Sequence, residues 1–186
     1  MRILVFGSLA YDRIMTFPGR FSDHILPDKL HILSVCFVLE GLQEKFGGTA
    51  GNIAYSLSLL GDSPTIVSSV GKDFEPYAAW LAKHGLTMQG IKRVPDDFTA
   101  GAYITNDQAD NQITAFNPGA MRVQAGYSLD GLDPAGTLGI VAPGCLADMK
   151  HYCAKFKELG IPLFFDPGQN ITAFSGEELA EMLTGA

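Results

Sequence analysis

The chain has 186 residues, of which 47% are hydrophobic and 18% are charged. This composition excludes an intrinsically disordered chain, and the length is enough for one large domain with a substantial core. The formal net charge of −7 argues against the clustered Lys and Arg with which proteins bind nucleic acids or anionic membranes, so small polar ligands are the expected partners.

The cysteines and the N-terminus indicate a cytoplasmic protein. Cys36, Cys145 and Cys153 are too few for a disulfide framework, and no two of them have C-x-x-C spacing. No signal-peptide pattern follows Met1, and no stretch of about 18 apolar residues occurs. We therefore expect a soluble protein in a reducing compartment.

Four short apolar runs predict strands that are buried on both faces of a parallel sheet. They cover residues 3–6, 65–67, 138–141 and 162–165. Helical spacing of apolar residues predicts helices over residues 50–60, 73–85, 146–156 and 175–183, with Asp73 capping the second and a Ser175/Glu178 capping box opening the last. This alternation predicts a layered α/β domain with right-handed crossovers.

Two segments, residues 13 to 46 and 98 to 118, do not fit the alternation. They contain extended stretches over residues 32–39, 102–105 and 112–116, the last two joined by a polar loop suited to a hairpin. We expect them to form a small β-sheet lid inserted into a core of residues 1 to 12, 47 to 97 and 119 to 186. The alternatives are a decorative hairpin or a sheet used only for dimerisation.

A glycine pair precedes the first predicted helix, in the stretch Phe46-Gly47-Gly48-Thr49-Ala50-Gly51-Asn52. Paired glycines let the backbone approach a ligand and leave the first helical amides pointing outward, while Asn52 offers a donor and an acceptor. The stretch is neither a P-loop nor a dinucleotide motif, because the Lys and the glycine spacing are missing. The alternative is an ordinary connection.

Two further groups of polar residues follow predicted strands. Asp12, shortly after Gly7-Ser8, carries a carboxylate that could accept two hydrogen bonds from the vicinal hydroxyls of a ribose, each worth roughly 1.5–3 kcal/mol. Gln169 and Asn170 follow the strand predicted over residues 162–165. The alternatives are that Asp12 caps a turn or pairs with Arg13, and that Asp166-Pro167-Gly168 only ends a strand. No histidine has metal-ligand spacing.

Together these residues resemble the N-terminal part of a PfkB-type (ribokinase-like) carbohydrate and nucleoside kinase, and the bacterial adenosine kinase branch in particular. The resemblance runs across essentially the whole chain. It is carried by Gly7-Ser8 and Asp12, Phe17-Pro18-Gly19-Arg20-Phe21-Ser22, Leu26-Pro27, Gly47-Gly48 with Asn52, Val70-Gly71-Lys72-Asp73-Phe74, Phe116-Asn117-Pro118-Gly119-Ala120-Met121, and Asp166-Pro167-Gly168-Gln169.

The resemblance implies a ribokinase-like α/β fold with a mostly parallel central sheet and a small β-sheet lid that also forms a homodimer surface. It also implies which residues bind the substrate. Asp12 and Asn52 would hold the sugar hydroxyls, and Phe37 and Phe116 would sandwich the base. The remaining implied substrate-binding residues are Ser8, Cys36, Gly47, Gly48, Gln169 and Asn170. On pattern alone, Cys36, Phe37, Tyr103 and Phe116 are more typical of core residues than of ligand contacts.

The resemblance also implies a reaction, in which the γ-phosphoryl of Mg·ATP moves to the 5′-hydroxyl of adenosine. The family motif Gly-x-Gly-Asp, which supplies the general base and an anion hole, does not occur in the 186 residues. We therefore expect this chain to bind substrate weakly and to be inactive or nearly inactive by itself. Cys36 and Ala102 depart from the Ser and aromatic residues of similar enzymes. Another nucleoside, a ribokinase-like sugar kinase and a non-catalytic dimeric binding module remain alternatives.

Overall fold

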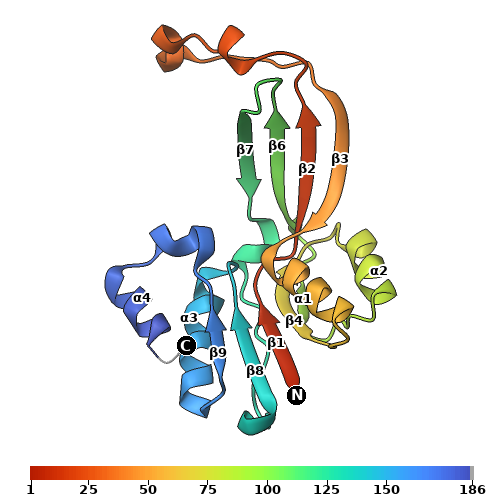
Figure 1. The fold of residues 1–186 in the computed structure, drawn as a ribbon, viewed down its shortest axis with the longest axis vertical. Helices are drawn as coiled ribbons and strands as arrows, with labels where there is room; N and C mark the ends of the chain where they lie inside the picture. Colours follow the sequence, from red (N-terminus) through yellow and green to blue (C-terminus); the bar gives the residue numbers. More distant parts are fainter. Residues whose placement is uncertain (185–186) are drawn as a thin grey trace.

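A computed structural model describes residues 1–184 and shows two separate β-sheets (Figure 1). The larger sheet is parallel throughout, with the strand order β5-β4-β1-β8-β9. Its strands are β1 (Arg2–Phe6), β4 (Thr65–Val70), β5 (Ile91–Arg93), β8 (Thr137–Val141) and β9 (Leu163–Phe165). The predicted fold class is therefore confirmed: the fold is layered α/β, with a mostly parallel central sheet and a small separate sheet.

Helices cover both faces of the larger sheet. Alternate residues of β1 point to opposite faces, so that Ile3 and Val5 pack in one core cluster and Leu4 and Phe6 in the other. The first cluster also contains residues of α1 (Thr49–Leu59) and α2 (Glu75–Lys83). The second contains residues of α3 (Leu146–Leu159) and α4 (Gly176–Leu183). The apolar runs of the sequence form strands because both faces of this sheet are covered.

The strand order reverses direction at β1, and this fixes where a ligand can bind. The chain extends the sheet from β1 to β4 and β5 on one side, and later from β8 to β9 on the other. The loops that leave the carboxyl ends of β1 and β8 therefore turn to opposite faces and open a crevice between them. Ser8 and Pro143 lie at this switch point, where Ser8 N donates to the Pro143 carbonyl at 3.0 Å.

The smaller sheet has the order β3-β2-β6-β7 and stands above the carboxyl ends of the larger one (Figure 1). Its strands are β2 (Ala10–Thr16), β3 (Glu40–Gly47), β6 (Ala100–Asn106) and β7 (Gln112–Asn117). The expected hairpin is confirmed, since β6 and β7 pair antiparallel around residues 107–111. The division of the chain into a core and an inserted lid stays a prediction.

Two expectations about the local structure are wrong. Residues 33–39 form no strand; they belong to an arm that projects from the far end of the smaller sheet (Figure 1), and β3 starts only at Glu40. Asp73 does not cap α2, whose N-cap is Phe74, because the Asp73 carboxylate accepts the Thr99 amide at 2.7 Å instead. Within residues 1–184 the structure contains no helix that is long and apolar enough to cross a membrane.

Candidate functional site

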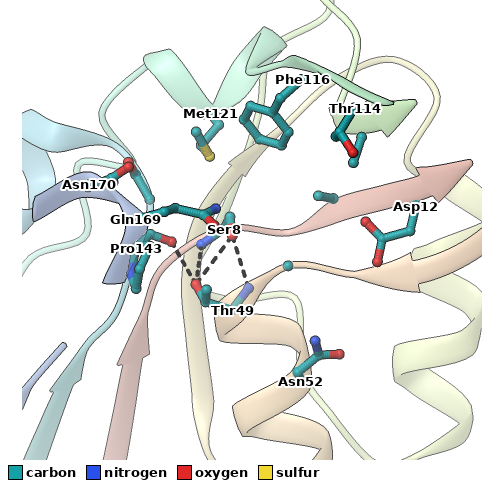
Figure 2. Close-up of a pocket in the computed structure, with 14 residues that line it drawn as sticks. Ser8, Asp12, Thr49, Asn52, Thr114, Phe116, Met121, Pro143, Gln169 and Asn170 are labelled. Atoms are coloured by element: carbon teal, nitrogen blue, oxygen red, sulfur yellow. Dashed lines mark hydrogen bonds between the residues drawn. The ribbon is translucent and has the colours of Figure 1, made fainter. Parts of the chain in front are cut away.

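A cavity of about 510 Å³ lies between the two sheets, at the carboxyl ends of β1 and β8 (Figure 2). This volume is in the range of small-molecule sites. Six segments that are distant in sequence line it, through Ser8, Ala10, Asp12, Gly48, Thr49, Asn52, Ala102, Thr114, Phe116, Met121, Pro143, Gly144, Gln169 and Asn170. Seven of the predicted site residues thus line one cavity: Ser8, Asp12, Gly48, Asn52, Phe116, Gln169 and Asn170.

Asp12 presents a carboxylate that is partly buried and accepts no hydrogen bond from any residue in the described range 1–184. It lies on β2, directly opposite Lys45 of β3. Burial raises the pKa of Asp12 above its usual value, and the positive charge of Lys45 opposes this rise. A desolvated carboxylate without a protein donor is suited to accept hydrogen bonds from ligand hydroxyls.

Glycine is required at positions 47 and 48 for two different structural reasons. A Cβ at Gly47 would collide with the Asp12 carboxylate, so Gly47 makes room for that side chain without itself lining the cavity. Gly48 has φ of 91°, and a Cβ there would lie 2.8 Å from the Ala10 amide nitrogen. Only glycine combines this φ with so close a backbone approach. Asn52 follows in the first turn of α1, with an exposed side chain.

Ser8 accepts hydrogen bonds from the first backbone amides of α1, although 41 residues separate it from Thr49. The Thr49 amide donates to Ser8 Oγ at 2.9 Å, and the Ala50 amide donates to the Ser8 carbonyl at 3.0 Å. The expectation that these first amides point outward to a ligand is therefore wrong, because Ser8 already accepts from them. The Thr49 hydroxyl donates to the Pro143 carbonyl at 2.6 Å and so joins α1 to the end of β8 (Figure 2).

The smaller sheet contributes one face to the cavity. Asp12, Ala102 and Phe116 are register partners across β2, β6 and β7, so their side chains point to the same side. Phe116 is 47% exposed, which leaves its ring available to a ligand. Ala102 adds little bulk beside it, and Thr114 supplies a hydroxyl.

The polar pair after β9 lies on a short 3-10 helix, Gly168–Ala173. Asn170 Nδ2 donates to the Gly144 carbonyl at 3.2 Å, so part of its polar capacity is already used. Gln169 makes no side-chain hydrogen bond with a residue in the described part of the chain. Figure 2 shows both residues at the edge of the cavity formed by the β8 and β9 loops.

Cys36 and Phe37 do not line the cavity, and their role in substrate binding stays a prediction. Both lie in the projecting arm, where the Phe37 ring packs 4.7 Å from Phe17 and 5.1 Å from Phe21, measured between ring centroids. These aromatic contacts hold Phe37 in the arm rather than at the site. Within one chain, Phe116 therefore lines the cavity without Phe37.

Sequence reasoning missed several lining residues. Thr49 lies inside the glycine motif, but its hydroxyl contact to Pro143 spans 94 residues and leaves no local pattern. Pro143 and Gly144 follow β8 at its carboxyl end, and the rule that ligands bind at that edge would have identified them. Thr114 lacks such a signal, because only the strand register directs it inward.

The comparisons agree on one family. The model of the pfkB family carbohydrate kinases matches residues 3–136. A nucleoside kinase of Methanothermobacter thermautotrophicus is 32% identical over 148 residues, which are 76% of this chain and 47% of the relative. The chain thus spans about half the length of the curated relatives that it matches.

Solved structures show the same likeness. The nucleoside kinase of Burkholderia thailandensis in complex with inosine has 38% identity and a TM-score of 0.80, covering 99% of this chain and 58% of that chain. A nucleoside kinase of Methanocaldococcus jannaschii, an archaeal member of the ribokinase family, has a TM-score of 0.81 at 24% identity, covering 97% and 57%, which is a likeness of fold alone.

Proposed function

The chain belongs to the pfkB family of carbohydrate kinases, and from that membership we propose that its cavity binds a nucleoside as the acceptor of a phosphoryl group. The observation that carries the proposal is the Asp12 carboxylate, which has no donor within residues 1–184 and lines the same cavity as Asn52. A carboxylate and an amide that line one cavity can bind the two neighbouring hydroxyls of a pentose.

A base attached to that pentose has a place in the same cavity. The exposed Phe116 ring offers a stacking surface, and stacking of this kind adds roughly 0.5–1.5 kcal/mol beyond burial. Thr114 and Gln169 offer hydrogen-bonding groups to the edge of a heterocycle. A relative at 38% identity is solved with inosine, which supports a purine nucleoside. We propose adenosine as the first candidate and inosine as the second.

We propose that the described residues do not form the complete phosphoryl-transfer site. Among residues 1–184 no group of three or more His, Cys, Asp or Glu side chains could hold a metal ion, and Ser8 accepts from the first amides of α1. No residue here is therefore assigned to ATP or Mg²⁺. We propose that these residues bind and orient the nucleoside, and that this chain alone has little or no transfer activity.

We also propose that the smaller sheet and its arm form a homodimer surface. Large apolar side chains of the arm are exposed, including Leu30 at 58%, Ile32 at 65% and Val38 at 81%. Exposed apolar patches of this kind commonly mark contacts with another protein. Sedimentation equilibrium tests the proposal, and a monomer at micromolar concentration would contradict it.

Isothermal titration with adenosine, inosine and ribose tests the substrate. The proposal expects heat from at least one purine nucleoside and weaker binding of ribose, which lacks the base that Phe116 contacts. A ribokinase-like sugar kinase predicts the reverse order. Binding of ribose without binding of either nucleoside would contradict a nucleoside site.

A further inference from the structure

A second, much smaller cavity lies beneath the floor of the nucleoside cavity, between β4 and the beginning of α3. Its volume is about 10 Å³, and Ser69, Gly144, Cys145, Asp148 and Met149 are among the residues that line it. Gly144 and Met121 border both cavities. A space of this size holds roughly one water molecule.

Ser69 directs a hydroxyl without a partner toward this cavity. Ile66 and Val70 of β4 pack with α1 and α2, whereas Val67 packs with α3. Because side chains alternate along a strand, Ser68 faces α1 and α2 and Ser69 faces α3. Ser69 is only 3% exposed, and its Oγ has no hydrogen-bond partner among residues 1–184. A buried hydroxyl without a partner costs about 1–3 kcal/mol.

The opposite wall supplies the other groups that a small polar ligand needs. Cys145, the N-cap of α3, gives no side-chain cap to the first turn of the helix, and no other side chain among residues 1–184 accepts from those amides. The Asp148 carboxylate is 9% exposed and accepts the Ala125 amide at 2.9 Å. Burial raises the pKa of Asp148. Hydrogen bonds from Ala125 and Gln124 and the nearby His151 and Lys92 only partly offset this rise, so a further donor would stabilise the charge.

We propose that this cavity binds one ordered water molecule, held between Ser69 Oγ on β4 and the first turn of α3 with Asp148. Water fits where an ion does not. The positive end of the helix dipole disfavours a cation, and the Asp148 carboxylate disfavours an anion. Water both donates and accepts, so it satisfies a hydroxyl, a carboxylate and an amide together. The water would then join β4 and α3 directly below Gly144, whose carbonyl accepts from Asn170.

Two serine variants distinguish a hydrated cavity from a dry one, because the melting temperature should decrease in one case and stay equal or increase in the other. If water is bound, Ser69→Ala removes one of its partners and lowers the melting temperature by about 2–4 °C. If the cavity is dry, Ser69→Ala removes an unsatisfied hydroxyl and leaves the melting temperature unchanged or raises it, which would overturn the proposal. Ser68→Ala is the matched control. Ser68 also lines the cavity, but the alternation of β4 turns its side chain toward α1 and α2. Its hydroxyl is similarly buried and has no partner among residues 1–184, and no decrease is expected from this variant.

A crystal structure of the wild-type chain at high resolution gives a direct readout that needs no variant. The proposal expects a density peak within hydrogen-bond distance of both Ser69 Oγ and the Asp148 carboxylate. A cavity without density would overturn it. A peak that contacts Asp148 alone, together with an unchanged melting temperature of Ser69→Ala, would also overturn it, because Ser69 would then not hold the water.

Discussion

The carboxylate of Asp12 occupies the space that the Cβ of any larger residue at position 47 would need. Asp12 belongs to β2 and Gly47 to the end of β3, and the two strands pair antiparallel. The first glycine of the motif therefore serves the site by leaving room for an acidic side chain. The second, Gly48, is fixed by its own backbone conformation.

Gly47→Ala should displace the Asp12 carboxylate and weaken nucleoside binding on the order of 10-fold to 100-fold, the range expected for losing one charged hydrogen bond. Titration calorimetry measures the affinity, and thermal melting checks the fold. Gly176→Ala is the control, because a Cβ there meets no atom within 4 Å and its affinity should not change. Unchanged affinity in Gly47→Ala would contradict the prediction, because nucleoside binding would then not depend on the position of the Asp12 carboxylate.

Asp12→Asn should lose nucleoside affinity by a similar factor without losing stability at neutral pH. The pKa of Asp12 is raised in the folded state, chiefly by burial, so the folded protein binds this proton more tightly than the unfolded one. The contribution of Asp12 to stability therefore falls as pH rises from its ordinary pKa of 3.8 through the raised value. Removing the charge should leave the melting temperature at pH 7 equal or higher.

The wild-type chain should also bind nucleoside less tightly as pH falls through the raised pKa of Asp12, because a protonated carboxyl accepts hydrogen bonds more weakly. Titrations at several pH values measure this, and in Asp12→Asn the dependence should disappear. Asp62→Asn, at an exposed position, controls for the loss of one negative charge. A large decrease in the stability of Asp12→Asn would instead indicate a structural carboxylate.

Thr49→Val should lower stability by about 1–3 kcal/mol, because it leaves the Pro143 carbonyl without its side-chain donor and the Ser8 amide with one acceptor fewer. Thr49→Ser keeps the hydroxyl and should recover most of the stability. Nucleoside affinity should fall in the Val variant as well, since Gly48 and Asn52 flank this contact. Denaturant unfolding and calorimetry measure the two effects, and equal stability of Val and Ser variants would contradict this role.

Asp107 should organise the tip of the smaller sheet. Burial tends to raise its pKa, but hydrogen bonds from the Phe21, Asn111 and Ala109 amides and the Asn111 side chain outweigh this and lower the pKa to about 2. Its contribution to stability is therefore complete above the ordinary pKa of 3.8 and is lost as pH falls from there toward 2.

Asp107→Asn should accelerate hydrogen exchange at the amides of Phe21, Ala109 and Asn111 without changing nucleoside affinity, because this loop is remote from the cavity. Asp110→Asn, in the same loop, should leave exchange unchanged, since Asn tolerates the positive φ of 59° found there. Equal protection in both variants would show that the Asp107 hydrogen bonds do not hold the loop.

Strands that are covered on both faces could be predicted from the sequence, whereas in the smaller sheet only the β6–β7 hairpin could, and β2 and β3 could not. Val5 and Ile66 belong to apolar runs because each face of their sheet is buried. β3 is polar and exposed along most of its length, so its composition gives no strand signal. The apolar run at residues 32–39 indicated a strand, but those side chains belong to the projecting arm.

The candidate site was accessible to sequence reasoning where chemistry follows a strand end, as at Asp12 and Gln169. Sequence reasoning could not predict the parts of the site in which contacts between distant segments determine what a side chain binds. The Ser8 hydroxyl, for example, accepts from α1 only because β1 and α1 meet at the switch point. Phe37 packs in an aromatic cluster of the arm that no local pattern reveals.

A crystal structure of the chain with bound inosine or adenosine tests the central claim most directly. The account predicts the 2′- and 3′-hydroxyls of the ribose within hydrogen-bond distance of the Asp12 carboxylate and the Asn52 side chain, with the base against Phe116. A nucleoside bound elsewhere, or bound in this cavity with its ribose turned away from Asp12, would contradict it.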